Sequence, residues 1–343
     1  MDKKNLLKLL NDTEENDTGS SEGTRTLLID GLNLFFRNFA MMNMVNPSGI
    51  HIGGLGGFFR SLGAEIRRTQ PDQVYVVFDG AGSTTNRKNI LSEYKSGRED
   101  QRVTNWEVFD SLDDEHDSKV DQIVRVIHYL KTLPVKTVIL DKVEADDIIA
   151  YLCDKLPNHP DDKVFIVSSD KDFLQLVNKN VIVYRPMEKK YYTEEVFKSK
   201  YKMSPQNFIL HKTLLGDASD KIKGVKGLGE KGLLKKFPEL SERDLTFDDI
   251  FEICEKKFKD HVVYARIIQG VDDLEKNYKV MDLSNPMMDE NEKKYLDEVA
   301  KSKELNYIPE QFISLYNEDQ LGGMIRNLDY WLKENFERLY KWH

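Results

Sequence analysis

Acidic residues stand at the ends of three apolar runs that have the length and composition of buried strands. TLLID ends at Asp30, VYVVFD ends at Asp79, and VFIVSSD ends at Asp170, with Asp172 two residues later. Ligands of open α/β sheets bind outside the carboxyl ends of the strands, so we expect these side chains to converge on one crevice. One such aspartate is explained equally well as a helix N-cap, but three caps with the same placement are a less economical explanation.

In two further groups, acidic residues stand close together in the sequence. VEADDIIAYL places Glu144, Asp146 and Asp147 at the start of a segment whose apolar residues recur at helical spacing. Acidic side chains favour a helix N-terminus because they oppose its dipole, yet three within four residues exceed what a cap requires. In LLGDASDKIKG, Asp217 and Asp220 stand three apart and share one face if the segment is helical. That pair alone would indicate a solvated turn.

Carboxylates brought together in this way would repel one another strongly unless cations lay between them. No cluster of His or Cys accompanies them in the sequence, and oxygen ligands favour Mg²⁺ or Mn²⁺ over zinc. Two such ions about 4 Å apart would polarise a phosphate, activate a water and stabilise the leaving oxygen, which predicts phosphodiester hydrolysis. The predicted metal-site residues are Asp30, Asp79, Glu144, Asp146, Asp147, Asp170, Asp172, Asp217 and Asp220.

The net charge of −9 at first argues against a nucleic-acid partner, which normally leaves a basic signature. Nine of the 59 acidic residues belong to the groups above, however, and without them 50 acidic residues face 50 basic ones. The negative net charge is therefore concentrated in the predicted metal site, and the rest of the sequence is neutral overall.

The composition, 40% hydrophobic and 32% charged, is typical of a globular protein. No apolar run approaches the ~20 residues of a membrane helix, and the N-terminus lacks the layout of a secretory signal, so we expect a cytoplasmic protein. Cys153 and Cys254 lie far apart in apolar helical contexts, which predicts reduced, packed thiols.

The elements that position the acidic residues are predicted by apolar, β-branched runs that alternate with segments of helical length. Nearly continuous apolar runs are typical of strands covered on both faces, so we predict an α/β fold with a mostly parallel central sheet flanked by helices. A long polar insertion at 82–117 interrupts this rhythm, and from Ser204 the pattern becomes helical and Gly/Lys-rich. The strand-like runs are 26–29, 73–78, 136–140, 163–167 and 181–184. Residues 1–24 are predicted to be a disordered tail, because Asn, Asp, Glu, Thr, Gly and Ser dominate from Asn11 to Thr24.

Six motifs, in this order, resemble those of the flap endonuclease and 5′-3′ exonuclease family: LIDGLNLFFR, VVFDG, RKNILSEYKSGR, VEADD, SSDKDF and LLGDASDKIKGVKGLGEKG. The resemblance covers residues 25 to 240, and the length without an attached polymerase is most similar to the bacteriophage type, such as T4 ribonuclease H. It implies a PIN-like 5′ nuclease core at 25–203, with a helical arch at 82–117. A helix-hairpin-helix DNA-binding region at 204–290 and a C-terminal helical extension at 291–343 would follow.

The resemblance also implies roles for individual residues. Arg37, Lys95 and Arg98 would meet the scissile phosphate, where bidentate Arg and a point-charge Lys can neutralise charge that develops in the transition state. The alternative for Arg37 is an ordinary surface cation. Asp30, Asp79, Glu144, Asp146 and Asp170 would surround one metal position; Asp172, Asp217 and Asp220 would lie nearer a second, with Asp147 supporting them.

In the implied arch, Arg87, Lys88 and Tyr94 would join Lys95 and Arg98 in an electrostatic funnel, with an aromatic ring available for stacking on a 5′ single strand. The acidic stretch SLDDEHD departs from a wholly basic arch. It is either a solvated face or a device that repels wrongly placed strands, and the sequence leaves both open.

GVKGLGEKG matches the hairpin of the family, whose backbone amides and lysines hold duplex phosphates without reading sequence. The implied DNA-binding residues there are Gly224, Lys226, Gly227, Gly229 and Lys231. A potassium ion at the hairpin is also implied, although Lys221 and Lys223 replace the Asn and Pro common in the family and Gly232 replaces a larger residue.

These features predict a structure-specific 5′-3′ exonuclease and flap endonuclease of replication, monomeric and without a membrane partner. Its substrates would be DNA with a 5′ single-stranded end or flap and RNA–DNA duplexes. The alternatives are a catalytically idle accessory that binds junctions and a PIN-type ribonuclease, which needs neither the basic insertion nor the hairpin.

Aromatic residues are dense near the C-terminal end of the sequence. Their spacing indicates core helices first, and docking of a single-strand binding protein or polymerase is the alternative. The residues concerned are Tyr330, Trp331, Phe336, Tyr340 and Trp342.

Overall fold

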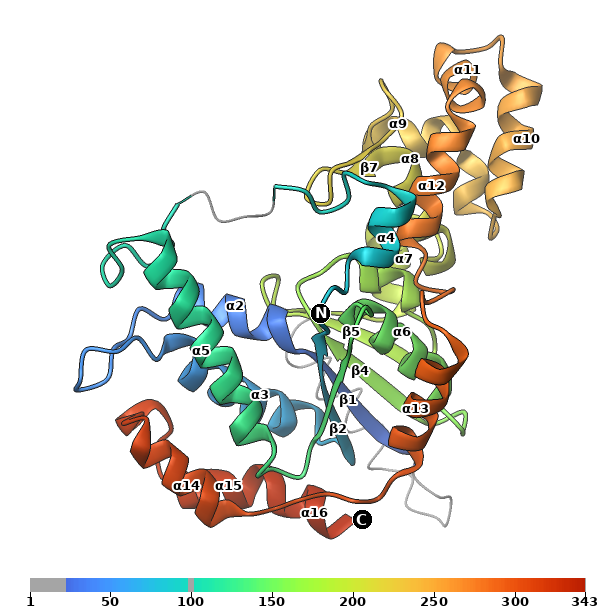
Figure 1. Cartoon of the computed structure of the whole chain (residues 1–343). Helices are drawn as coiled ribbons and strands as arrows, with labels where there is room; N and C mark the ends of the chain where they lie inside the picture. The colour runs from blue at the N-terminus through green and yellow to red at the C-terminus, as the bar shows by residue number, and fades with distance from the viewer. Residues whose placement is uncertain (1–22, 98–101, 343) are drawn as a thin grey trace.

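A six-stranded sheet forms the centre of the computed structural model, which describes residues 23–97 and 102–342 (Figure 1). The strand order is β3-β2-β1-β4-β5-β6; β6 is antiparallel to β5, and all other pairs are parallel. The strands are β1 (Arg25–Asp30), β2 (Gln73–Asp79), β3 (Lys136–Leu140), β4 (Lys163–Val167), β5 (Val181–Arg185) and β6 (Lys190–Tyr192). All five predicted strands are present, so the α/β prediction is confirmed; in this sheet, the three-residue β6 was not foreseen.

The order of the strands brings the predicted acidic ends together. The chain moves outward from β1 to β2 and β3 and then returns to the other side of β1 with β4. Strands β1 and β4 therefore meet at a topological switch point, where parallel sheets open a crevice at their carboxyl edge. The register pairs Asp30 with Val77 of β2 and Ile29 with Val167 of β4, so the acidic residues that end these strands lie at one edge.

Alternate side chains of the central strand enter two separate cores. Leu27 and Ile29 belong to one core, and Leu28 belongs to the other, as the two-residue period of a strand requires. Helices α2 (Gly31–Met41), α3 (Gly53–Thr69) and α5 (Leu112–Leu130) cover the first core, and α6 (Ala145–Lys155) covers the second (Figure 1). Cys153 and Cys254 are buried and free, as predicted.

The insertion between β2 and β3 begins with the short helix α4 (Thr85–Ile90), which packs on α12 (Val271–Met281), and ends with α5, which packs on α3. Its acidic stretch forms the first turns of α5. The Ser111 hydroxyl accepts a hydrogen bond from the Asp114 backbone N–H at 3.1 Å, and the buried Glu115 accepts one from the Thr104 N–H at 2.8 Å. A capped helix start accounts for these acidic residues, because they oppose the helix dipole. The predicted Arg98 lies outside the described residues.

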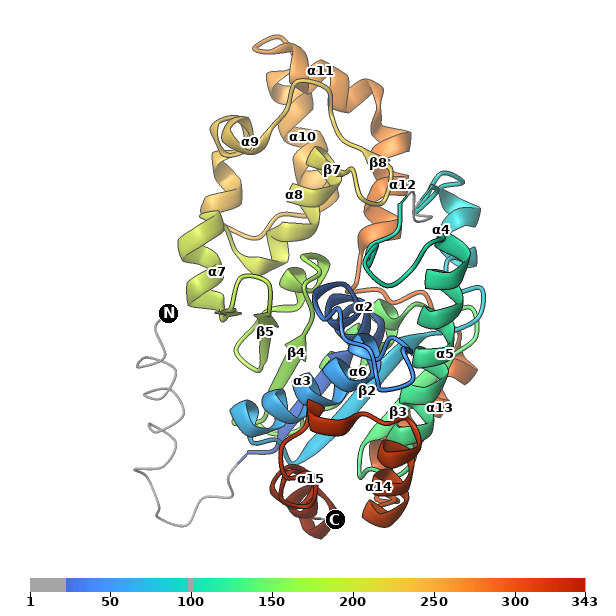
Figure 2. The ribbon, with the colours of Figure 1, turned by 90° about the vertical axis from the view of Figure 1, so that its left-hand side faces the viewer.

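The part that follows β6 is helical and joins the second core. In it α8 packs against α12, and the hairpin with its two-stranded ladder connects α8 to α9 along the chain. The ladder lies on the α12 side of α8 (Figure 2). Its elements are α7 (Glu194–Tyr201), η2 (Pro205–Asn207), α8 (Phe208–Leu215), β7 (Gly216–Asp217), β8 (Ile222–Lys223), α9 (Glu230–Lys236), η3 (Pro238–Ser241), α10 (Phe247–Lys257), α11 (Val262–Gln269) and α12. The short helix η1 (Asp172–Leu176) lies earlier, between β4 and β5.

Helix α13 (Glu290–Lys301) packs on α6 and belongs to the second core. The helices after it return to the first core and lie below the sheet in Figure 1. Trp331 and Phe336 are buried, and Gly63 of α3 leaves the room that the Trp331 ring occupies, so the core interpretation holds for both. Tyr330 and Tyr340 are exposed. The helices after α13 are α14 (Pro309–Glu318), η4 (Gly322–Met324), α15 (Leu328–Leu332), the π-helical turn η5 (Lys333–Glu337) and α16 (Arg338–Trp342). Within the described ranges, no helix is both long and apolar enough to span a membrane.

Candidate active site

The carboxylates that end β1 and β2 act as caps and still lie at one edge of the sheet. Asp30 accepts hydrogen bonds from the Asn33 backbone N–H at 3.0 Å and from the Ser168 hydroxyl at 2.9 Å. Asp79 accepts one at 2.7 Å from the backbone N–H of Ala145, the first residue of α6. The cap and site interpretations are therefore compatible, because a carboxylate that caps a helix at this edge also brings its charge to the crevice.

Asp170, which follows β4, is the third carboxylate at this edge of the sheet. Its backbone N–H donates to the Ser168 hydroxyl at 3.0 Å, and its carboxylate accepts from the Asp172 N–H at 2.9 Å. The Ser168 hydroxyl thus connects Asp170 with Asp30. Ser168 was not among the predicted site residues, although it lies in the SSDKDF motif that was recognised.

Burial and neighbouring carboxylates raise the pKa of two aspartates in this crevice, Asp30 and Asp146. The pKa of Asp30 is raised to about 7, mainly by burial; the charges of Asp79 and Asp170 contribute to the increase, and local hydrogen bonds oppose it. Burial also raises the pKa of Asp146 well above its usual value; Asp170 and Asp30 add to the increase, and Lys95 opposes it. The structure therefore brings these predicted residues within electrostatic reach of one another.

A second acidic group is joined by Lys212 of α8. Its ammonium group contacts the carboxylate of Asp172 and lies 2.7 Å from Oδ2 of Asp217. The pKa of Asp172 is raised to about 7, mainly by burial; the charge of Asp170 contributes to the increase, and Lys212 opposes it. Lys212 was missed by the sequence analysis. Its position five residues before Asp217, on the helix that leads into LLGD, was the available signal.

Lys95 connects the insertion to both acidic groups. Its Nζ donates to Oε2 of the buried Glu144 at 2.7 Å, and its backbone N–H donates to the carbonyl of Asp220 at 3.0 Å. The charge of Asp146 also raises the pKa of Lys95, although burial opposes this. The structure thus places Lys95 among the carboxylates, where the resemblance implied a contact with the scissile phosphate.

The donor atoms fit a hard divalent cation. All are carboxylate oxygens, like charges crowd them, and Oε1 of Glu144 is buried without a hydrogen-bond partner. In this conformation, no three Asp, Glu, His or Cys side chains of the described residues converge closely enough to hold one ion. The ammonium groups of Lys95 and Lys212 lie between the carboxylates instead. Metal binding here would therefore compete with the two lysines.

Three predicted residues have a different position from the one we expected. Arg87 is only 2% exposed, and two guanidinium nitrogens donate to Asp147 at 2.5 and 3.0 Å, so neither side chain lies open to a DNA strand or a metal. Tyr94 is also buried and donates its hydroxyl to Glu144 at 3.2 Å rather than offering a ring for stacking. The sequence pattern could not show this, because the partners lie 50 or more residues away.

Arg37 lies two turns into α2, and at 1.5 Å per residue this is roughly 10 Å along the helix from Asp30. It is half-buried, its Nη1 atom lacks a hydrogen-bond partner, and its neighbours include the charged Glu65 and Arg68 and the phenol of Tyr184. The structure therefore places Arg37 with this group. Lys88, by contrast, is exposed as predicted.

The hairpin presents lysines on a rigid turn. Gly227 has a φ of +84°, which favours glycine, and a side chain at Gly224 would collide with the backbone of Leu215. Arg266 of α11 donates to the carbonyl of Lys226 at 2.7 Å and holds the turn. The side chain of Lys226 is exposed. Gly229 and Lys231, the other two predicted residues of the hairpin, are exposed as well.

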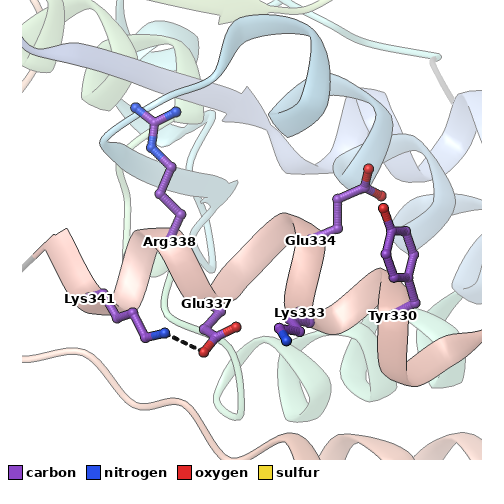
Figure 3. Close-up of a pocket in the computed structure, with 6 residues that line it drawn as sticks. All are labelled: Tyr330, Lys333, Glu334, Glu337, Arg338 and Lys341. Carbon is purple, nitrogen blue, oxygen red and sulfur yellow. Dashed lines mark hydrogen bonds and ion pairs between the residues drawn. The ribbon is translucent and has the colours of Figure 1, made fainter.

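A hollow of about 660 Å³ on the C-terminal helices is not part of this site (Figure 3). It lies at the far end of the molecule from α4 and α8 (Figure 1). Its lining residues are Tyr330, Lys333, Glu334, Glu337, Arg338 and Lys341, with Lys341 paired to Glu337.

The parallel sheet with acidic carboxyl ends, the insertion after β2 and the lysine-bearing hairpin define the class of 5′ nucleases with a PIN-like core. The chain belongs to the 5′-3′ exonuclease family, because residues 25–202 match the model of the 5′-3′ exonuclease N-terminal resolvase-like domain. The family assignment made from the motifs is thereby confirmed.

Relatives include the 5′-3′ exonuclease of Aquifex aeolicus, which is 34% identical over 214 residues, or 61% of this chain and 68% of that protein. The 5′-3′ exonuclease of Bacillus subtilis is 29% identical over 268 residues, or 76% of this chain and 83% of that protein. DNA polymerase I of Lactococcus lactis subsp. cremoris is 32% identical over 250 residues, and the chain spans only 27% of its length.

The same fold occurs in solved structures of low identity. The bacteriophage T5 D15 flap endonuclease, crystallised with DNA and metal ions, has a TM-score of 0.60 at 20% identity, covering 92% of this chain and 99% of that one. Human GEN1 with Holliday junction DNA has a TM-score of 0.57 at 14% identity, covering 92% and 72%. These structures confirm the predicted fold.

Proposed function

We propose that this protein is a structure-specific 5′-3′ exonuclease and flap endonuclease that hydrolyses DNA and RNA–DNA with Mg²⁺. The observation that carries the proposal is that Asp30, Asp79, Asp146 and Asp170 lie at one edge of the sheet: Ser168 bridges Asp30 and Asp170, and Asp79 caps the helix that bears Asp146. Support comes from the exonuclease relatives and from the T5 flap endonuclease, which was crystallised with DNA and metal ions.

Two acidic groups would hold the metal ions. Asp30, Asp79, Asp146, Asp170 and Glu144 form one, and Asp172, Asp217 and Asp220 form the other. Bound divalent ions would supply positive charge to the scissile phosphate and make water a stronger nucleophile.

Lys95 is the cation of the chain best placed to accompany these carboxylates. Once ions neutralise the carboxylates, its ammonium group is free to turn from Glu144 to the developing charge of the phosphate. The exposed lysines of the hairpin, Lys226 and Lys231, would hold duplex phosphates away from the cut.

The test is cleavage of a 5′-labelled flap duplex and of an RNA-primed duplex with Mg²⁺, with EDTA and with the Asp170→Ala protein. We expect products near the junction that require Mg²⁺ and a loss of at least about 100-fold in rate in the variant, because the like-charged ligands act together. Binding of the flap duplex to Asp170→Ala should remain measurable.

Asp154→Asn serves as the matched control, because its carboxylate is 76% exposed at the other end of α6. It should cleave at the wild-type rate. Tight binding without cleavage by the wild-type protein under any divalent metal would instead identify an idle junction-binding accessory. Hydrolysis retained in Asp170→Ala would contradict the assignment of the site.

A further inference from the structure

Arg87 joins three elements that are distant in the sequence. It belongs to α4, its Nη1 and Nη2 atoms donate to both oxygens of Asp147 in α6, and its Nε donates to the carbonyl of Val280 in α12 at 2.7 Å. Asp147 also accepts from the backbone N–H of Met287 at 3.0 Å, in the segment between α12 and α13. One ion pair thus fastens the start of the insertion to the nuclease core and to the helical region.

The same guanidinium lies next to the catalytic carboxylates. Its Nη1 atom is 3.5 Å from Oε2 of Glu144, the oxygen that also accepts from Tyr94 and from Lys95. Arg87, Asp147 and Glu144 have side chains that are no more than 3% exposed. A shift of Arg87 would therefore be transmitted to the carboxylate that Lys95 contacts.

A gain in the stability of the fold does not explain the buried Arg87–Asp147 ion pair. Two buried charges lose their hydration, and well-packed apolar side chains of similar volume are often as stable or more stable. An apolar pair cannot form the three directed hydrogen bonds that the planar guanidinium group of Arg87 donates. Lysine cannot reproduce it either, because its ammonium group is a single point charge.

We propose that Arg87 and Asp147 are positioning residues that hold the base of the insertion, with Tyr94 and Lys95, and the end of α12 in register with Glu144. The inference rests on the proposed function for its effect on cleavage. Its structural part, the placement of residues 91–97, can be measured without cleavage.

The first experiment compares wild type, Arg87→Lys and the double variant Arg87→Met with Asp147→Leu in the full chain. Single-turnover cleavage of the flap duplex gives the rate, and binding of the same duplex in Ca²⁺ gives Kd. We expect rates about 10–100-fold below wild type in both variants, as for other groups that orient metal-site residues, with Kd changed by less than about threefold. Lys155→Met, which removes an exposed cation from α6, should match wild type.

The double variant separates positioning from folding, because it leaves no buried charge unpaired. We expect its free energy of unfolding to equal or exceed that of wild type while its rate stays low. Hydrogen exchange should also be about tenfold faster for the amides of Tyr94 and Lys95, which are bonded to Leu91 and Asp220 in the structure.

A double variant that cleaves at the wild-type rate, or whose 91–97 amides exchange as in wild type, would overturn the inference. If wild type cleaves no substrate, the proposed function fails, and the exchange measurement still decides whether the pair positions this segment.

Discussion

Lys212 places one ammonium group between carboxylates from two parts of the chain, Asp172 after β4 and Asp217 after α8. Burial alone would lower the pKa of Lys212, but the two negative charges outweigh it and raise the pKa. In return, Lys212 lowers the pKa of Asp217 to about 2 against the effect of burial. At neutral pH Lys212 thus neutralises negative charge of Asp172 and Asp217, as a divalent ion would. The lysine and the ion would compete for the same carboxylate oxygens.

This competition predicts the behaviour of Lys212→Met. Without metal, the buried carboxylates lose their partner, and we expect unfolding in urea with EDTA to show a loss of about 3 kcal/mol. Mg²⁺ should restore more stability to the variant than it adds to wild type, because the ion takes the lysine's place. Lys155→Met provides the control for removal of one charge. An equal loss with and without Mg²⁺ would contradict the prediction.

On the scale of an element, helix α8 carries a histidine that should respond to acid. His211 stacks on Phe208 with ring centroids 5.1 Å apart, and burial lowers its pKa to about 4, with smaller contributions from Lys212 and Lys171. The folded protein therefore binds fewer protons at this site than the unfolded chain between pH 4 and the usual pKa of 6.5. Stability consequently falls as the pH drops through this window.

His211→Gln should remove this part of the pH dependence. We expect wild type to lose roughly 2 kcal/mol more than the variant between about pH 7 and pH 4.5, because one pKa unit corresponds to about 1.4 kcal/mol. Urea unfolding at several pH values measures both slopes. His159→Gln, at an exposed loop position, is the control and should keep the wild-type slope. Parallel slopes for wild type and His211→Gln would disprove the role of the imidazole.

The strands and the acidic residues that follow them could be predicted from the sequence, whereas long-range side-chain contacts could not. Nearly continuous apolar runs identified five strands, because a strand buried on both faces has a local signature, whereas the three-residue β6 has none. The acidic residues at strand ends were found because parallel strands share one carboxyl edge. Arg87 and Lys212 could not be interpreted in this way. Arg87 meets a carbonyl 193 residues away, and Lys212 meets an aspartate 40 residues away.

Over the whole molecule, the C-terminal helices complete the core in which the first strand lies. Phe312 of α14 packs on Phe59 of α3 and Tyr129 of α5, with ring centroids 5.3 and 4.9 Å apart. Asp319 accepts hydrogen bonds from Arg125 and Tyr129 of α5 at 2.8 and 2.7 Å. Helices α14 to α16 therefore pack with the first core of the sheet, although the helical segment from α7 to α13 precedes them in sequence.

Phe312→Ala should consequently destabilise the nuclease core. We expect a loss of about 3–5 kcal/mol, because a fully buried aromatic ring is replaced by a cavity. Tyr330→Ala, which truncates a ring that is 59% exposed, should change the free energy of unfolding by less than about 0.5 kcal/mol. Denaturation in urea measures both. A loss below about 1 kcal/mol for Phe312→Ala would show that the extension is only loosely attached.

Because α14 packs on the sheet but comes late in the sequence, one face of the sheet is covered only late in translation. The chain emerges from the ribosome with β1 first, yet the face of the sheet that carries Leu27 and Ile29 stays partly uncovered until Phe312 and Trp331 have followed. Some 280 residues are made in between, including the helices from α7 to α13. A growing chain would therefore expose apolar surface for most of its translation, which is a condition that favours binding of a chaperone to the nascent protein.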